Sequence, residues 1–133
     1  MEAVMPPQDE TVLIVDDEPL MTDVFRQWMT KRGFRVLTAS SGREAMETLA
    51  VEAGAIRLVI TDLTMPDMSG QELARSLYAR APTLPVLIAT GHDLDASEID
   101  LPPNVVEIVR KPYQNRVLAD RMREIIKERR ASG

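Results

Sequence analysis

The stretch that most constrains this chain is TVLIVDDEP at residues 11–19, where an aliphatic run ends abruptly at Asp16 and Asp17. Because no polar residue interrupts the run, it predicts a strand buried on both faces, the pattern typical of parallel sheets. In open α/β sheets, ligands bind at the carboxyl ends of the strands. Two adjacent carboxylates repel each other unless a cation or a hydrogen-bond donor offsets their charge. The stretch therefore predicts a charged site at one end of a buried strand.

Strand and helix patterns alternate along the rest of the chain. Apolar runs predict further strands at about residues 34–39, 58–62, 85–90 and 105–109. Capping-box patterns at residues 41–44 and 69–72 predict two helix starts. The first helix is expected between Pro19 and Gly33, with Asp17 or Glu18 as its cap. The expected inward faces of the first and last helices are Met21, Val24, Phe25, Trp28 and Met29, and Val117, Leu118, Met122, Ile125 and Ile126.

This alternation predicts an α/β fold, a doubly wound parallel sheet of five strands with helices on both faces. Residues 92–104 are acidic and contain Pro102 and Pro103, so any helix there must be short. We expect residues 1–10 to be a disordered lead-in, residues 11–130 to form the domain, and residues 131–133 to be a tail.

Several polar side chains follow the predicted strands. Because parallel strands end on the same edge, Asp16, Asp17, Asp62, Thr90 and Lys111 should converge in one pocket. Carboxylate oxygens suit Mg²⁺, and an ammonium group with a hydroxyl would complete a phosphoryl site. A carboxylate can itself be the nucleophile and form an aspartyl phosphate. Asp62 is the expected nucleophile, because it stands alone while Asp16 and Asp17 can hold the metal.

Four motifs, taken in order, resemble the response-regulator receiver domain of two-component signalling. They are VDDEP at residues 15–19, TDLTMPDMSG at 61–70, ATG at 89–91 and RKPY at 110–113, and the resemblance covers about residues 11–126. It implies a flavodoxin-like sheet with strand order 2-1-3-4-5. The sequences of residues 10–13 and 85–88 also resemble those of receiver domains at the C-terminus of hybrid sensor histidine kinases.

The resemblance also implies roles for particular residues. Asp62 would be the phosphoacceptor, Lys111 would contact a phosphoryl oxygen, Thr90 would be the switch hydroxyl, and the Lys111–Pro112 bond would be cis. The implied cofactor is Mg²⁺, with Asp17, Asp62 and the carbonyl of Thr64 as ligands and with Asp16 acting through bound water. The implied partner is a sensor histidine kinase or a histidine phosphotransfer protein. The resemblance is also compatible with a weak homodimer. The expected function is a phosphorelay module whose phosphorylation alters partner binding, and not an enzyme acting on other substrates.

The amino-acid composition excludes some classes of function. The net charge of −5 and pI of about 4.9 argue against direct nucleic-acid binding. Nothing near the start has the apolar core of a signal peptide or a membrane span, so the expected location is cytoplasmic. The absence of cysteine excludes disulfides.

Three other functions compete with that of a phosphoacceptor. A Mg²⁺-dependent phosphohydrolase of the haloacid-dehalogenase type would carry a second Asp two residues after its nucleophile, and Asp62 is followed by Leu63 and Thr64. A nucleotide-binding domain would need a Gly-x-Gly motif, and the chain has none. A receiver-like module that binds partners without phosphorylation is the main alternative. Ile108 departs from the family, which usually has an aromatic residue there, and this leaves the output mode open.

Overall fold

A computed structural model describes residues 10–52, 54–91 and 100–132 of the chain. Apart from Glu10, the lead-in expected at residues 1–10 lies outside the described residues. Most of residues 92–104, where any helix was expected to be short, lies outside them too. The described strands and helices, in chain order, are β1 (Thr11–Val15), α1 (Pro19–Lys31), β2 (Arg35–Ala39), α2 (Gly42–Glu52), β3 (Ile56–Asp62), α3 (Gly70–Arg80), β4 (Val86–Thr90), β5 (Val105–Arg110) and α4 (Asn115–Ser132).

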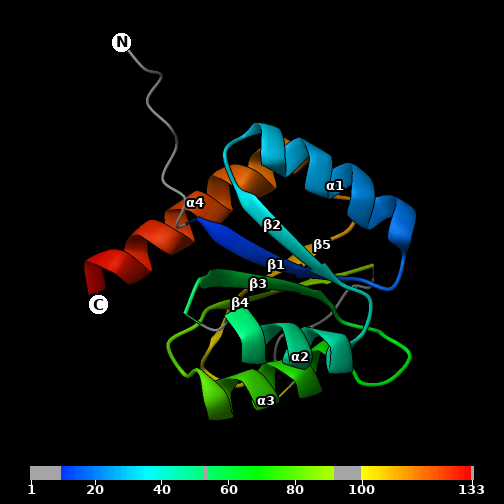
Figure 1. The fold of residues 1–133 in the computed structure, drawn as a ribbon, viewed down its shortest axis with the longest axis vertical. Coiled ribbons are helices and arrows are strands. Elements are labelled where there is room, and N and C mark those ends of the chain that lie inside the picture. The colour runs from blue at the N-terminus through cyan, green and yellow to red at the C-terminus, as the bar shows by residue number, and fades with distance from the viewer. Residues whose placement is uncertain (1–9, 53, 92–99, 133) are drawn as a thin grey trace.

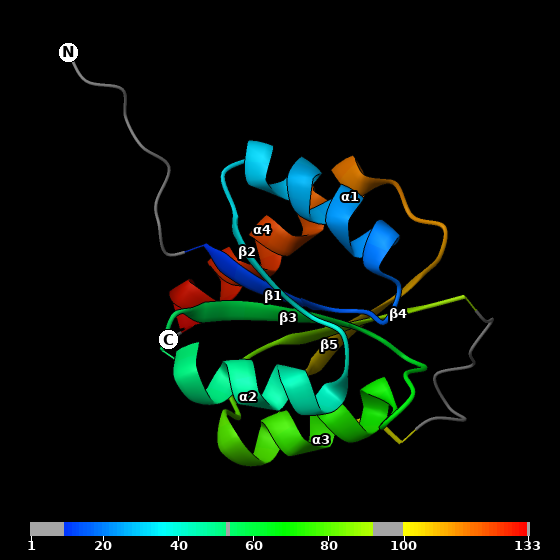
Figure 2. The same cartoon turned by 45° about the vertical axis from the view of Figure 1, so that its right-hand side comes forward.

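The five strands form a single parallel sheet in the order β2-β1-β3-β4-β5. This confirms the predicted sheet and its strand order. Helices α1 and α4 cover one face of the sheet, and α2 and α3 cover the other (Figure 1, Figure 2). All of β1 and β4 is buried, because these strands have neighbours on both sides and helices above and below. The unbroken apolar runs are therefore explained by burial on both faces.

Two apolar cores lie on the two faces of the sheet. Leu13 and Val59 point toward α2 and α3, where they meet Leu73 and Leu77. The alternate strand residues face α1 and α4, because successive side chains in a strand point to opposite faces. The second core contains Val12, Ile14, Phe25, Met29, Leu58, Ile60, Leu87, Leu118, Met122, Ile125 and Ile126.

Among the described side chains, the inward faces of α1 and α4 differ from the prediction at two positions; the Met21 side chain, also expected inward, lies outside the described ones. Val24 and Val117 are each 61% exposed, so placing them in the core was wrong. Phe25 and Met29 of α1 are buried as expected, and Thr22 joins them at 9% exposure. Residues 22, 25 and 29 have helical spacing on one face, and residue 24 lies about a quarter turn away from it. Trp28 is half-buried, with the Arg32 guanidinium 4.3 Å from its ring centroid.

The helix starts follow the capping predictions to different degrees. At α3 the capping box is complete, since Ser69 accepts from the Glu72 N–H and Glu72 accepts from the Ser69 N–H. At α2 the Ser41 hydroxyl accepts from the Glu44 N–H, but the Glu44 carboxylate accepts from Ser40 instead. At α1 the capping position is Glu18, yet its side chain makes no capping bond. The predicted start of α1 is therefore correct, while the predicted side-chain cap is not formed.

None of the helices in the described part of the chain is both long enough and apolar enough to cross a bilayer.

Candidate functional site

The polar residues predicted to converge do lie at the carboxyl ends of four strands. Asp16 follows β1, Asp62 ends β3, Thr90 ends β4 and Lys111 follows β5. The parallel registers bring these ends together: Asp62 pairs with Ala89, and the Lys111 N–H donates to the Thr90 carbonyl at 2.7 Å. A buried sheet therefore fixes the backbone under each side chain. This rigidity lets groups from distant parts of the sequence share one site.

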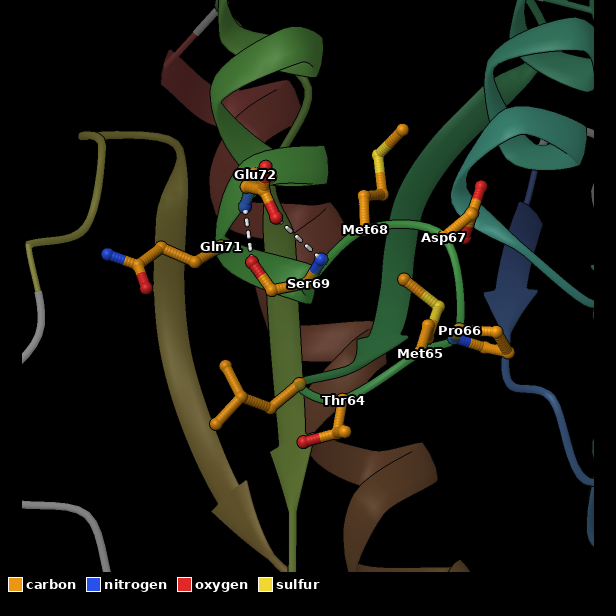
Figure 3. A pocket seen from close by; sticks show the side chains of 9 residues that line it. Thr64, Met65, Pro66, Asp67, Met68, Ser69, Gln71 and Glu72 are labelled. Carbon is orange, nitrogen blue, oxygen red and sulfur yellow. Dashed lines mark hydrogen bonds between the residues drawn. The ribbon is translucent and has the colours of Figure 1, made fainter.

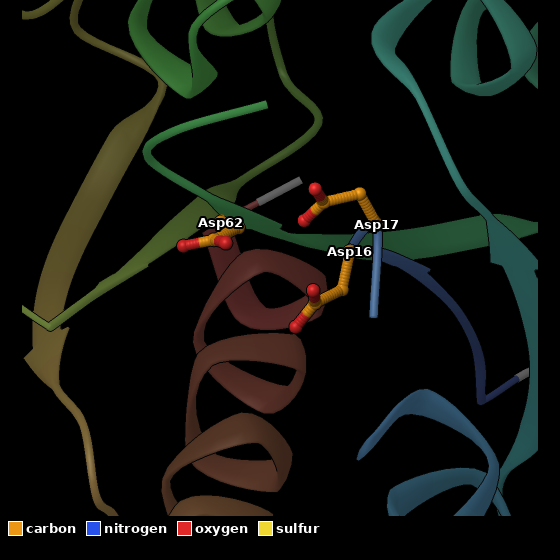
Figure 4. A group of neighbouring side chains, drawn as sticks. All are labelled: Asp16, Asp17 and Asp62. Carbon is orange, nitrogen blue, oxygen red and sulfur yellow. The ribbon is translucent and has the colours of Figure 1, made fainter. Parts of the chain in front are cut away.

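Three carboxylates form the centre of this site. One oxygen from each of Asp16, Asp17 and Asp62 lies within 4.8 Å of the others (Figure 4). The side chains of Asp16 and Asp62 are 12% and 15% exposed, while Asp17 is exposed. Such a cluster of hard oxygen donors at one solvent-accessible point fits a divalent cation of the Mg²⁺ type. The three residues predicted to bind metal through their side chains are thus brought together.

Lys111 supplies positive charge beside the carboxylates. Its ammonium nitrogen lies 3.3 Å from Asp16 Oδ2 and 3.5 Å from Asp62 Oδ1. The Leu63 N–H also donates to Asp62 Oδ1, at 2.9 Å, so two donors orient this carboxylate. The peptide bond between Lys111 and Pro112 is cis, as the sequence resemblance implied.

Opposing effects set the pKa values of these groups. Burial is the largest effect on Asp62 and raises the pKa of its carboxyl; Asp16 adds to this, and Lys111 opposes it without cancelling it. For Lys111, burial disfavours the ammonium form, but the attraction of Asp16 and Asp62 outweighs it and raises the pKa. The carboxylates and the ammonium therefore stabilise one another only in part. The residual negative charge favours a further cation at the site.

Thr90 and Thr64 complete the predicted set. The side chain of Thr90 is buried at 2% exposure, and its strand end lies beside that of Asp62. Thr64 lies in the β3–α3 loop, residues 63–69, one residue beyond Leu63, and its side chain is exposed. This loop and the start of α3 line a cavity of about 510 Å³ (Figure 3).

Two features of the site were not predicted from the sequence. Asp67, in the same loop, accepts hydrogen bonds from the first two backbone N–H groups of α2, at Gly42 and Arg43. A second cavity of about 400 Å³ lies between α1 and the start of α4 beside Lys111, and exposed Val24 lines it with Tyr113. Both features depend on contacts between segments far apart in the chain, and no local motif encodes them.

Comparison with known proteins agrees with this geometry. The family model described as "Response regulator receiver domain" matches residues 12–123. The chain is 30% identical over 119 residues to the sensor kinase CckA of Brucella abortus, covering 89% of this chain and 13% of that protein. The chain spans between 13% and 51% of the length of the first curated relatives that it matches.

Solved structures are similar over nearly the whole chain. A response regulator receiver domain protein from Clostridium thermocellum has a TM-score of 0.85 and 30% identity, with 92% of this chain and 98% of that one covered. The response regulator TrrA of Thermotoga maritima, solved in complex with Mg²⁺ and BeF, has a TM-score of 0.77 and 25% identity, with 87% and 98% covered. On its fold, its motifs and the family match, this chain belongs to the response regulator receiver domain family.

Proposed function

We propose that this chain is a phosphoacceptor module of a two-component phosphorelay, in which Asp62 takes a phosphoryl group from a phosphohistidine. The observation that carries the proposal is the position of the Lys111 ammonium, 3.3 Å from Asp16 and 3.5 Å from Asp62, within a cluster of three carboxylates. A carboxylate beside an ammonium and a cation site has the parts needed for phosphoryl transfer. The family match supports the same function.

Asp16, Asp17, Asp62 and the backbone carbonyl of Thr64 would hold Mg²⁺. When bound, this ion supplies positive charge that offsets the charge on the phosphoryl oxygens. The grouping of the three carboxylates within 4.8 Å supports this ligand set. The Mg²⁺ in the TrrA structure is a second line of support. We assign Asp16 mainly to water-mediated binding, because its Oδ2 contacts Lys111 and its Oδ1 accepts from the Glu18 N–H at 3.0 Å.

In the proposed reaction, a carboxylate oxygen of Asp62 attacks the phosphorus atom. A new O–P bond forms as the P–N bond to the donor imidazole breaks, and the bonding electrons leave with the imidazole nitrogen. The donor ring leaves as a neutral imidazole because its other nitrogen carries a proton, so the products are an acyl phosphate on Asp62 and a free histidine on the donor. The Leu63 N–H and Lys111 orient the attacking carboxylate, which reduces the entropy lost in reaching the reactive geometry.

After transfer, we propose that Lys111 pairs with a phosphoryl oxygen and that the Thr90 hydroxyl donates a hydrogen bond to another. Both would be charge-assisted hydrogen bonds, which are stronger than neutral ones. Because Thr90 ends β4, a change in its position would move the backbone that follows it. Phosphorylation would in this way alter the surface offered to partners.

A histidine kinase or phosphotransfer protein would dock on the apolar surface next to Lys111. Leu20 is 82% exposed and Val24 is 61% exposed on α1, and Val117 is 61% exposed near the start of α4. Of these three, Val24 lines the cavity that reaches Lys111. An exposed aliphatic side chain at the edge of a cavity is typical of protein–protein contact sites. This surface adjoins the proposed acceptor, where the donor histidine must arrive, and so we assign it to the donor.

The test uses a small donor that contains the same P–N bond, phosphoramidate, together with Mg²⁺. We expect the intact protein to gain the mass of one phosphoryl group, and Asp62→Asn to abolish the gain. Asp100→Asn is the matched control, because the Asp100 side chain is 95% exposed and lies outside the carboxylate cluster. A normal mass gain in Asp62→Asn would refute the proposed acceptor.

A further inference from the structure

The carboxylate of Asp67 occupies the N-terminus of a helix that lies far from it in sequence. Its Oδ1 accepts from the Gly42 N–H at 3.1 Å, and its Oδ2 accepts from the Arg43 N–H at 2.9 Å. The first N–H groups of a helix have no partners within the helix, and a negative charge there is favourable. The bonds from Arg43 and Gly42 also lower the pKa of Asp67, so the group is ionised at neutral pH.

A second contact joins the same two segments. The Met68 side chain lies over Gly42, and a Cβ added at Gly42 would lie 2.3 Å from Met68 Cγ. Any larger residue at position 42 would therefore have to displace the Met68 side chain. The polar contact of Asp67 and the apolar contact of Met68 hold the tip of the β3–α3 loop against α2 (Figure 3).

The ends of this loop are held separately, at the sheet. The Leu63 N–H donates to the Ala89 carbonyl at 2.9 Å, and the Gly70 N–H donates to the Leu63 carbonyl at 2.7 Å. A Cβ on Gly70 would lie 2.4 Å from the carbonyl oxygen of Asp62. The loop is thus fixed at the sheet by its ends and at α2 by its tip, and Thr64 lies between these anchors.

We propose that Asp67 is a positioning residue for the metal site. By tying the loop tip to the start of α2, it holds the carbonyl of Thr64 where that carbonyl can complete the set of oxygen ligands formed by the carboxylates. The inference rests on the proposed function, because it takes Thr64 as a metal ligand. Residues that orient a metal ligand without touching the metal typically change affinity by 10- to 100-fold when removed.

The experiment compares two variants that each remove a hydrogen bond from the start of α2. Asp67→Ala removes the bonds that connect α2 to the loop, whereas Ser41→Ala removes the local bond to the Glu44 N–H. Mg²⁺ is titrated into each metal-free protein, and binding is followed by backbone amide shifts. We expect about tenfold weaker Mg²⁺ binding in Asp67→Ala, at the low end of that range. In Ser41→Ala we expect the affinity to stay within about twofold of the unaltered protein, because its cap does not touch the loop.

Hydrogen exchange in the metal-free proteins gives an independent readout. Asp67→Ala should expose the Gly42 and Arg43 amides to faster exchange, and the loop amides of residues 64–68 should exchange faster with them. Asp67→Asn keeps the shape and one acceptor oxygen, so it should fold and show a smaller loss of affinity. This variant keeps the test decisive if Asp67→Ala does not fold.

Three outcomes would overturn the inference, and they can be told apart. Absence of Mg²⁺ binding by the unaltered protein would reject the proposed function, and the role of Asp67 with it. Normal Mg²⁺ binding by both Asp67 variants would reject the role of Asp67 alone. Equal losses in Asp67→Ala and Ser41→Ala would also reject it, because a general weakening of α2 would then explain both.

Discussion

Lys111 and Asp16 form an ion pair of 3.3 Å across 95 residues of sequence, and both side chains are largely buried. The pair joins the end of β1 to the end of β5, which lie on the two sides of β3 and β4 in the sheet. Asp62, at the end of β3, shares the same ammonium at 3.5 Å. The proposed function rests on this arrangement, in which one cation balances two of three clustered carboxylates.

Replacing Lys111 should destabilise the metal-free protein. Lys111→Met leaves Asp16 and Asp62 without their cation, and losing a charge-assisted hydrogen bond of this kind costs about 1.5–3 kcal/mol of unfolding free energy. Since the raised pKa of Lys111 reflects attraction to these carboxylates, the stabilisation is present below pH 10.5 and is lost as the pH rises above it. Urea unfolding at neutral pH measures the loss.

Mg²⁺ should reduce the loss of unfolding free energy in Lys111→Met, because a cation bound by the carboxylates replaces part of the missing positive charge. Saturating a site at about 100 times its dissociation constant adds about 2.7 kcal/mol. Lys127→Met is the control, because Lys127 is exposed on α4 and should change stability little. Equal stability of Lys111→Met and the unaltered protein without Mg²⁺ would contradict the account.

Tyr113 should titrate above its ordinary pKa of 10.0. Burial raises the pKa of its hydroxyl, Asp16 and Asp62 raise it further, and Lys111 lowers it without reversing the shift. Because the folded-state value is raised, the stability that Tyr113 contributes is present below pH 10.0 and is lost as the pH rises through its folded-state pKa. Absorbance titration of Tyr78→Phe, which leaves Tyr113 as the remaining tyrosine, measures the midpoint.

Charge variants test the cause of the Tyr113 shift. In the Tyr78→Phe background, Asp16→Asn should lower the midpoint and Lys111→Met should raise it, because the two charges act in opposite directions. A midpoint at or below 10.0, or shifts of the opposite sign, would show that Tyr113 does not sense the site.

Features that depend on local sequence patterns could be predicted from the sequence, and features that depend on contacts between distant segments could not. The sheet and the grouping of Asp62 with Lys111 were predictable, because apolar runs mark parallel strands and their carboxyl ends share one edge. The exposure of Val24 was not, since helical spacing does not fix the width of the buried face. The bond from Asp67 to Gly42 was not predictable either, because it depends on how a loop folds across 25 residues of sequence.

Ile108 should keep the conformation of β5 nearly unchanged during activation. Its side chain packs against the α2–α3 core and lies opposite Ile88 in the sheet register. A β-branched residue is stiff at χ1, so it cannot make the large rotamer change available to an aromatic ring. We therefore expect beryllofluoride with Mg²⁺ to change the amide shifts of residues 105–109 little, and those of the segment after Gly91 more. Most of that segment lies outside the described residues.

A variant tests the role of Ile108 directly. Ile108→Tyr should increase the beryllofluoride response of residues 105–109, because the introduced ring can occupy two positions. Large changes in the amide shifts of residues 105–109 in the unaltered protein, with little change in the segment after Gly91, would show that Ile108 does not limit the movement of β5.

The most direct test of the central claim is to locate the phosphoryl group in the chain. The protein is treated with phosphoramidate and Mg²⁺, reduced with borohydride, digested and mapped by mass spectrometry. Borohydride converts an aspartyl phosphate into homoserine, so the account predicts homoserine at position 62 and unmodified aspartates at positions 16 and 17. Homoserine at either of those positions, or intact Asp62 in protein that has gained the phosphoryl mass, would contradict it.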